Sequence, residues 1–271
     1  MPFSDFGGGE RRPAFLTFGA AVWALAALIA EAAAPGGRWH GGQGWPAGGR
    51  GWAVASVQLA GAVALAGLVN GLLSGWLGSL WLGRRHRAAL RVLLTRRRER
   101  WAAHDAATSA GSPEERLRHT VLRNRVAPAR PESATWMGDR LLALETRVFN
   151  EYGLDFPSAW PRLWLVVPES CRAELRATAA SWRRATCWGA WALLYGVLAV
   201  VWWPLVLLMG VTLLWAVRSA RGAVEAATDL AEAVVDLYAK DLAAELGIAT
   251  PDGRVDPSVG RLITMRLRKG V

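Results

Sequence analysis

Three long apolar runs dominate the hydrophobic pattern of the chain. The first covers Ala14 to Ala34, and its 21 residues match the roughly 20 that a helix needs to cross a hydrocarbon core. The second covers Trp52 to Leu82 and the third covers Thr186 to Val217, and neither contains a charged residue. Because only helices and closed barrels satisfy their backbone groups in lipid, we expect an all-α integral membrane protein.

The third run is too long for one simple span. As a single helix its 32 residues would measure about 48 Å at 1.5 Å per residue. Pro204 divides it, and proline is a normal residue in the first turn of a helix. The pattern therefore predicts a hairpin of two short helices, 186–203 and 204–217, with one kinked helix as the alternative. With the first two runs as a second hairpin, we expect four spans.

Basic residues next to the second run predict the orientation of the chain. Arg84, Arg85, Arg87 and Arg91 follow this run closely, and the whole chain carries a formal net charge of +10. Lys and Arg concentrate on the cytoplasmic side of membrane proteins, so we expect a cell-membrane protein with both termini in the cytoplasm. These four arginines are predicted to contact anionic lipid headgroups. An arginine pair before the first run leaves a cleavable export signal open as an alternative to a first span.

The segment between the two hairpins combines helical patterns with a proline-rich stretch. Apolar positions from Asp139 to Tyr152 recur as in an amphipathic helix, and Gly153 suits its carboxyl cap. Three prolines within residues 154–168 predict that no regular helix forms there. A helix over 218–247 carries many acidic residues, and we expect it to pair with the basic segment after the second run.

The pattern as a whole predicts five parts. They are a transmembrane hairpin over residues 1–83, a basic and amphipathic cytoplasmic domain over 84–185, a second hairpin over 186–217, an acidic cytoplasmic helix over 218–247 and a flexible tail over 248–271. We expect the tail to be loosely ordered because it contains Pro251, Gly253, Pro257 and Gly260 close to a chain end.

Small residues form a ridge on the second apolar run. On a helical wheel Gly67, Gly71, Gly75 and Gly78 fall within one narrow arc. A ridge of small residues lets two helix backbones approach closely in lipid, where no hydrophobic force drives association. The ridge therefore predicts a packing seam, either between copies of the chain in a homo-oligomer or against a small face of the first run.

Three polar residues lie within or beside the apolar runs. Asn70 flanks the glycine ridge near mid-membrane, Gln58 lies nearer the outer side, and Glu31 is the one carboxylate inside a run. Hydrocarbon leaves such groups unsatisfied, so they must face protein or water. Glu31 can also reach interfacial water or pair with Arg38. All three are candidates for contact with permeant water or ions.

The remaining chemistry-bearing residues form no catalytic or metal-binding motif. Cys171 and Cys187 lack metal-ligand spacing. The histidines are scattered along the chain, at His40, His86, His104 and His119, and we interpret each as a surface residue. No nucleophile with a base, phosphate loop or nucleic-acid reading module stands out. We therefore expect no enzyme, no cofactor and no nucleic-acid partner.

Three short motifs carry a resemblance to a known group of proteins. They are Tyr152-Gly153-Leu154-Asp155, Trp160-Pro161-Arg162-Leu163-Trp164 and Trp202-Trp203-Pro204. Through them the chain resembles, over residues 136 to 247 at most, a family of multi-pass actinobacterial membrane proteins of unknown function. The resemblance implies the membrane class and no site residue.

Two functions fit these patterns. The first is a homo-oligomeric channel or pore component, suggested by the glycine ridge beside polar residues. The second is a membrane-anchored scaffold or signalling subunit that recruits a cytoplasmic protein partner through the segment between the hairpins and the acidic helix.

Overall fold

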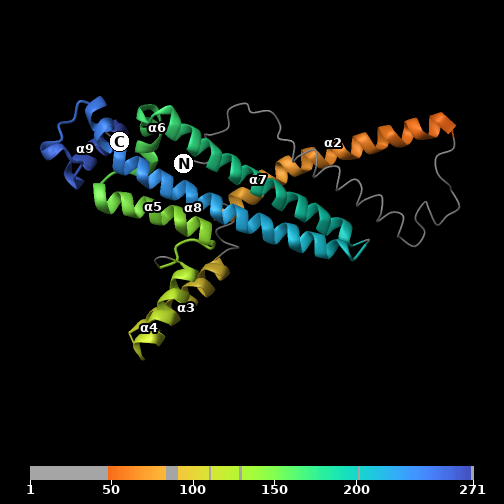
Figure 1. Cartoon of the computed structure of the whole chain (residues 1–271), viewed down its shortest axis with the longest axis horizontal. Helices are drawn as coiled ribbons and strands as arrows, with labels where there is room; N and C mark the ends of the chain where they lie inside the picture. The colour runs from red at the N-terminus through yellow and green to blue at the C-terminus, as the bar shows by residue number, and fades with distance from the viewer. Residues whose placement is uncertain (1–47, 84–90, 110, 128–129, 201, 270–271) are drawn as a thin grey trace. The chain divides into compact units, whose positions relative to one another are not determined.

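The computed structural model describes residues 48–83, 91–109, 111–127, 130–200 and 202–269 (Figure 1). Every regular element in these ranges is a helix and none is a strand, which confirms the all-α class for this part of the chain. The first predicted span, with Glu31, lies outside the described residues. So do Arg84, Arg85 and Arg87, so their predicted lipid contacts stay predictions.

The described helices follow one another through short connections. They are α2 (Gly48–Trp81), α3 (Arg91–Thr108), α4 (Pro113–Val126), α5 (Trp136–Tyr152), α6 (Phe156–Val166), α7 (Glu169–Ala199), α8 (Leu205–Glu245), the short 3-10 helix η1 (Pro251–Gly253) and α9 (Pro257–Arg268). They form two compact units. One unit takes in Ser79–Ala180 and the segment that begins at Arg221, and the other takes in α2 up to Gly78 with Ser181–Ala220.

Two of these helices are long and apolar enough to cross a membrane. They are Val63–Trp81 within α2 and α8, Leu205–Glu245. Only 22% and 17% of their most apolar windows are buried inside the protein, whereas the core helix of a soluble protein is mostly buried. Large side chains such as Leu72 and Val211 are exposed on them. An apolar surface of this extent requires either lipid or another protein to cover it.

The four predicted spans are not confirmed. α7 ends at Ala199 and α8 begins at Leu205, so the two helices are separated at the break that contains Pro204. Both extend far beyond the predicted ranges 186–203 and 204–217. α7 is not among the described helices that are long and apolar enough to cross a membrane.

The core of the first unit is built from α5, α6, α9, the start of α7 and the second half of α8. Its fully buried side chains include Leu144 of α5, Leu163 of α6, Val235 of α8 and Ile263 of α9. The acidic helix and the tail therefore belong to the same folded unit as most of the predicted cytoplasmic domain. Sequence segments that seemed separate share one core.

Helix α6 corrects the expectation that residues 154–168 form no regular helix. Pro157 lies in its first turn, where a missing N–H breaks no helical hydrogen bond. Pro161 lies inside the helix and removes one bond. Phe156, Trp160 and Leu163 are nevertheless buried at helical spacing, and burial of three large side chains outweighs that loss at about 1.5–3 kcal/mol each.

Helix α9 corrects the prediction of a loosely ordered tail. Asp256 caps its amino end by accepting hydrogen bonds from Ser258 and Val259. Its buried face packs into the core of the first unit. The backbones of α5 and α9 approach so closely that a Cβ atom built on Gly260 would lie 1.7 Å from the carbonyl oxygen of Tyr152. Only glycine fits there, and the close approach fixes α9 against the end of α5.

Gly153 ends α5 in the left-handed backbone region, with φ of 65°. Its N–H donates to the carbonyl oxygen of Phe149 at 2.8 Å. A Cβ atom at this position would also lie 2.4 Å from the carbonyl oxygen of Pro257. The amphipathic helix and glycine cap expected from the sequence are therefore present, and the cap turns the chain toward α6 beside the start of α9.

Candidate functional site

Asn70 is fully enclosed within the second unit, between α2 and α7. Its side chain is 0% exposed. The amide Nδ2 donates to the backbone carbonyl oxygen of Cys187 at 3.1 Å, and the Cys187 thiol donates to Asn70 Oδ1 at 3.0 Å. Both ends of the amide are thus used within the chain. Asn70 faces protein, as the sequence required, and the pair joins α2 to α7 in the second unit.

The glycine ridge is mostly open on the described side of α2. A Cβ atom built on Gly67 or Gly71 would meet no atom of the described residues within 4 Å. At Gly78 it would meet the methyl group of Thr186 at 3.5 Å, so this end of the ridge packs against α7. The predicted packing seam along the other glycines stays a prediction. The side chain of Gln58 is not among the described parts.

Helices α3 and α4 form a hairpin with a polar interface. Neither helix contains a buried residue. Arg123 of α4 donates from Nη1 to Asp105 of α3 at 2.8 Å, and its guanidinium lies over the ring of Trp101 at 5.8 Å. Ser112 caps the amino end of α4 and forms a capping box with Glu115. Arg91, the one described member of the predicted lipid-contact set, is exposed at the start of α3.

His104 and His119 meet across this hairpin. Their Nδ1 atoms lie 3.3 Å apart, and the ring centroids are 5.6 Å apart with the planes tilted by 39°. The sequence treats the two residues as unrelated because 15 positions separate them. The two rings come together because α4 folds back along α3.

Arg97 fastens the hairpin to the amino end of α5. Its Nη1 lies 2.8 Å from Asp139 Oδ2, and its two terminal nitrogens also donate to the carbonyl oxygens of Ser133 and Val126. Asp139 is buried, and burial raises its pKa although the hydrogen bonds from Ser133 and Glu132 and the charge of Arg97 act in the opposite direction. Three contacts through one guanidinium make this a structural joint.

The acidic residues of α8 pair with α5, which corrects the predicted pairing with the basic segment after the second run. Arg147 makes a two-pronged contact with Glu232, with Nε to Oε1 at 2.7 Å and Nη2 to Oε2 at 2.6 Å. Arg140 contacts Asp229 at 2.6 Å. The hydrogen bond from Arg147 lowers the pKa of Glu232. These contacts lie within the first unit, where α5 and α8 run side by side (Figure 1).

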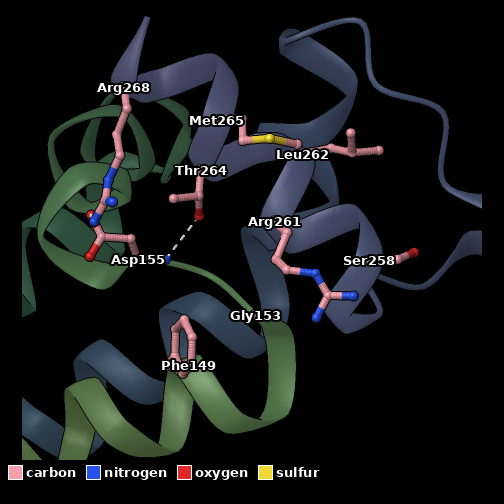
Figure 2. A pocket seen from close by; sticks show the side chains of 9 residues that line it. All are labelled: Phe149, Gly153, Asp155, Ser258, Arg261, Leu262, Thr264, Met265 and Arg268. Carbon is pink, nitrogen blue, oxygen red and sulfur yellow. Dashed lines mark hydrogen bonds and ion pairs between the residues drawn. The ribbon is translucent and has the colours of Figure 1, made fainter. Parts of the chain in front are cut away.

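A groove of about 500 Å³ lies between the carboxyl end of α5 and α9 (Figure 2). Phe149 of α5 and Leu262 and Met265 of α9 line it and are exposed to solvent. Arg261 lines the same groove and is exposed. The groove thus offers three large apolar side chains beside a cationic one, although the core of the unit is complete without them.

Figure 2 also shows how the floor of this groove is held in place. The backbone N–H of Asp155 donates to Thr264 Oγ1 at 3.0 Å, and the Asp155 carboxylate lies 3.2 Å from Arg268. Ser158 donates a short hydrogen bond to the same carboxylate. Because these contacts join the start of α6 to α9, the groove has fixed walls.

The described residues contain no group of three or more His, Cys, Asp or Glu side chains that could hold a metal ion. Cys171 and Cys187 are both free. No known protein family, no curated protein and no solved structure matches this chain. The resemblance to actinobacterial membrane proteins therefore stays a prediction.

Proposed function

We propose that the protein is a membrane-anchored scaffold that recruits a protein partner through the groove between α5 and α9. Its apolar helices α2 and α8 hold it in the bilayer, and the first unit lies in water beside the membrane. The observation that carries the proposal is the exposed set of Phe149, Leu262 and Met265 beside Arg261.

Exposed apolar side chains of this kind lower the solubility of the isolated protein and do not contribute to the packing of its core. Three of them gathered in one groove, rather than scattered singly, are typical of a surface that binds another protein. Aromatic residues, methionine and arginine are also the types enriched at the centres of protein interfaces. The groove has fixed walls, so a partner would bind without a large cost of ordering it.

The expected partner has apolar side chains flanked by acidic ones. An apolar anchor would contact Phe149 and Met265, and a carboxylate would pair with the guanidinium of Arg261. Such complementarity raises the rate of association and selects the partner more than it raises affinity. A short amphipathic helix with acidic flanks fits a groove between two helices.

A homo-oligomeric channel remains the second candidate, supported by the glycine ridge, where a Cβ atom on Gly67 or Gly71 would meet no described atom within 4 Å. The channel is less well supported than the scaffold because of Asn70, the best placed of the predicted pore-lining residues. Its side-chain amide is hydrogen-bonded to Cys187. A buried amide with both ends bonded to its own chain does not contact permeant water. The remaining candidates, Gln58 and Glu31, have no described side chains.

Site-specific photo-crosslinking in membranes tests the scaffold directly. A photoreactive phenylalanine analogue at Met265, which is 59% exposed, would be compared with the same analogue at Leu117 of α4, which is 68% exposed. We expect a discrete heavier product from position 265 only, lost when Arg261→Glu is added. No product at 265, or the same products at both positions, would contradict the scaffold. A product at twice the mass of the chain would favour the homo-oligomer instead.

A further inference from the structure

We propose that the α3–α4 hairpin binds a divalent transition metal ion, with Zn²⁺ and Ni²⁺ as the expected ions, through His104 and His119. This site lies on a different element from the groove between α5 and α9. It stands whether or not the groove recruits a partner.

The separation of the two imidazoles matches the demands of one metal ion. Ligand nitrogens lie about 2.0–2.1 Å from Zn²⁺, so two of them at a tetrahedral angle are about 3.3–3.4 Å apart. The Nδ1 atoms of His104 and His119 are 3.3 Å apart. The distance between the two nitrogens is therefore already the one that a shared ion requires.

A direct hydrogen bond between the rings is the competing arrangement. It needs one Nδ1 to carry a proton and the other to accept it, and 3.3 Å is longer than the usual N–H···acceptor distance of about 2.9–3.0 Å. A metal ion needs both Nδ1 lone pairs, with the proton of each neutral ring on Nε2, and this tautomer serves both rings alike. The ion replaces a long hydrogen bond with two coordinate bonds.

The charges around the pair allow a cation to bind. Arg123, one turn beyond His119 on α4, is compensated by Asp105 of α3 at 2.8 Å. Glu115, one turn before His119, keeps its carboxylate at the helix cap, where the backbone and side-chain hydrogen bonds of Ser112 lower its pKa. Both histidines are partly exposed, so an ion can reach them from water.

Two protein ligands leave the other coordination positions to water or to a ligand from a partner. Such a site is exchangeable, unlike the closed four-ligand sites that structural zinc requires. Imidazole suits Zn²⁺, Ni²⁺ and Cu²⁺, and carboxylate-preferring ions such as Mg²⁺ and Ca²⁺ would not compete. The expected behaviour is one ion per chain with selectivity for the first group.

Binding would stiffen a hairpin that has little else to hold it together. Neither α3 nor α4 has a buried residue, and an exposed-side ion pair between Arg123 and Asp105 is among the contacts that join them. An ion bound by one histidine from each helix ties the two helices directly. Since Arg97 joins the hairpin to α5, a hairpin stiffened by the ion would keep a fixed orientation relative to the rest of the first unit.

Isothermal titration of the full chain in nanodiscs with Zn²⁺ or Ni²⁺ tests the site, with no polyhistidine tag present. We expect one ion per chain in the wild type. His104→Gln and His119→Gln, which keep a polar side chain but remove the imidazole, are each expected to weaken binding at least about tenfold, since loss of even an outer-shell group costs that much. His86→Gln is the matched control and should leave binding unchanged. Mg²⁺ should not bind at the pair.

Each outcome of the titration decides the proposal. A one-to-one site that both glutamine variants weaken supports it, provided circular dichroism shows the same helix content in the variants. The absence of a one-to-one site in the wild type would overturn it. Equal weakening by His86→Gln, or no weakening by His104→Gln, would also overturn it, because binding would then come from histidines in general.

Discussion

Replacing Ile263 by alanine measures whether α9 belongs to the folded core. Ile263 is 0% exposed and packs with α5, α6 and α8. The substitution removes three carbon atoms, worth about 2.4 kcal/mol at about 0.8 kcal/mol each. A cavity left in a packed core adds to this, so the expected cost is about 3 kcal/mol.

The assay is amide hydrogen exchange of the full chain, followed over α9. Local opening of the helix exposes its amides, and a loss of about 3 kcal/mol speeds exchange roughly 100-fold at about 1.4 kcal/mol per factor of ten. Leu262→Ala is the matched control, because its neighbouring side chain faces the groove. A surface change of this kind alters stability by about 0.5 kcal/mol or less, a factor of two or so.

Two results would refute the reasoning about α9. The first is exchange of the wild-type α9 amides at the rate of an unfolded chain, as a loosely ordered tail would show. The second is an equal effect of Ile263→Ala and Leu262→Ala, since the buried and exposed faces would then not differ.

Three further substitutions test other parts of the account. Asn70→Leu should lower the free energy of unfolding by about 1 kcal/mol in a denaturation titration in detergent, the usual scale of a side-chain hydrogen bond between membrane helices. It should leave any conductance unchanged. Altered conductance with unchanged stability would favour the channel. Glu232→Gln removes a carboxylate whose pKa is lowered by Arg147. The stabilisation that this carboxylate gives is fully present above its unfolded-state pKa of about 4.3. It is lost as the pH falls through the lower pKa of the folded state. The expected cost at pH 7 is about 1 kcal/mol for this partly exposed pair. A cost that does not shrink as the pH falls from 7 into the acid range would rule out the charge as its cause. Gly71→Leu should dissociate a homo-oligomer, as measured by its mass in nanodiscs. The chain should stay folded, because a Cβ atom at this position would meet no described atom within 4 Å. A monomeric wild type would exclude the seam.

The sequence predicted local structure well where one physical signal dominated. The helical periodicity before Gly153 and the cap at Gly153 are both present, because each depends on neighbouring residues alone. The apolar character of α2 and α8 was equally plain, since length and composition suffice to identify a helix of that kind.

The failures share a cause in long-range packing. Prolines at 157 and 161 suggested a break, yet the burial of Trp160 and Leu163 in a core assembled from distant helices outweighs the lost bond. The tail suggested disorder, and its order depends on the close approach of Gly260 to Tyr152, more than one hundred positions earlier. Neither contact can be predicted from the pattern of neighbouring residues.

The candidate site was largely beyond the sequence for the same reason. Phe149 lay on a predicted amphipathic helix, but nothing paired it with Leu262 and Met265 in a groove. His104 and His119 are brought together only by the turn between α3 and α4. Asn70 was identified correctly as a group that must face protein, and its partner, the backbone of Cys187, has no side-chain signature.

The central claim is that one end of α8 lies in lipid while the other end lies in water, and cysteine accessibility tests it most directly. Val211 and Leu237 are both 69% exposed on this helix. Each would be replaced by cysteine in a chain without Cys171 and Cys187, and labelled with a membrane-impermeant maleimide in membranes open to the reagent on both sides. We predict rapid labelling at 237 and little at 211 until detergent is added. Equally fast labelling at both positions before detergent would contradict the membrane anchor and the scaffold that depends on it.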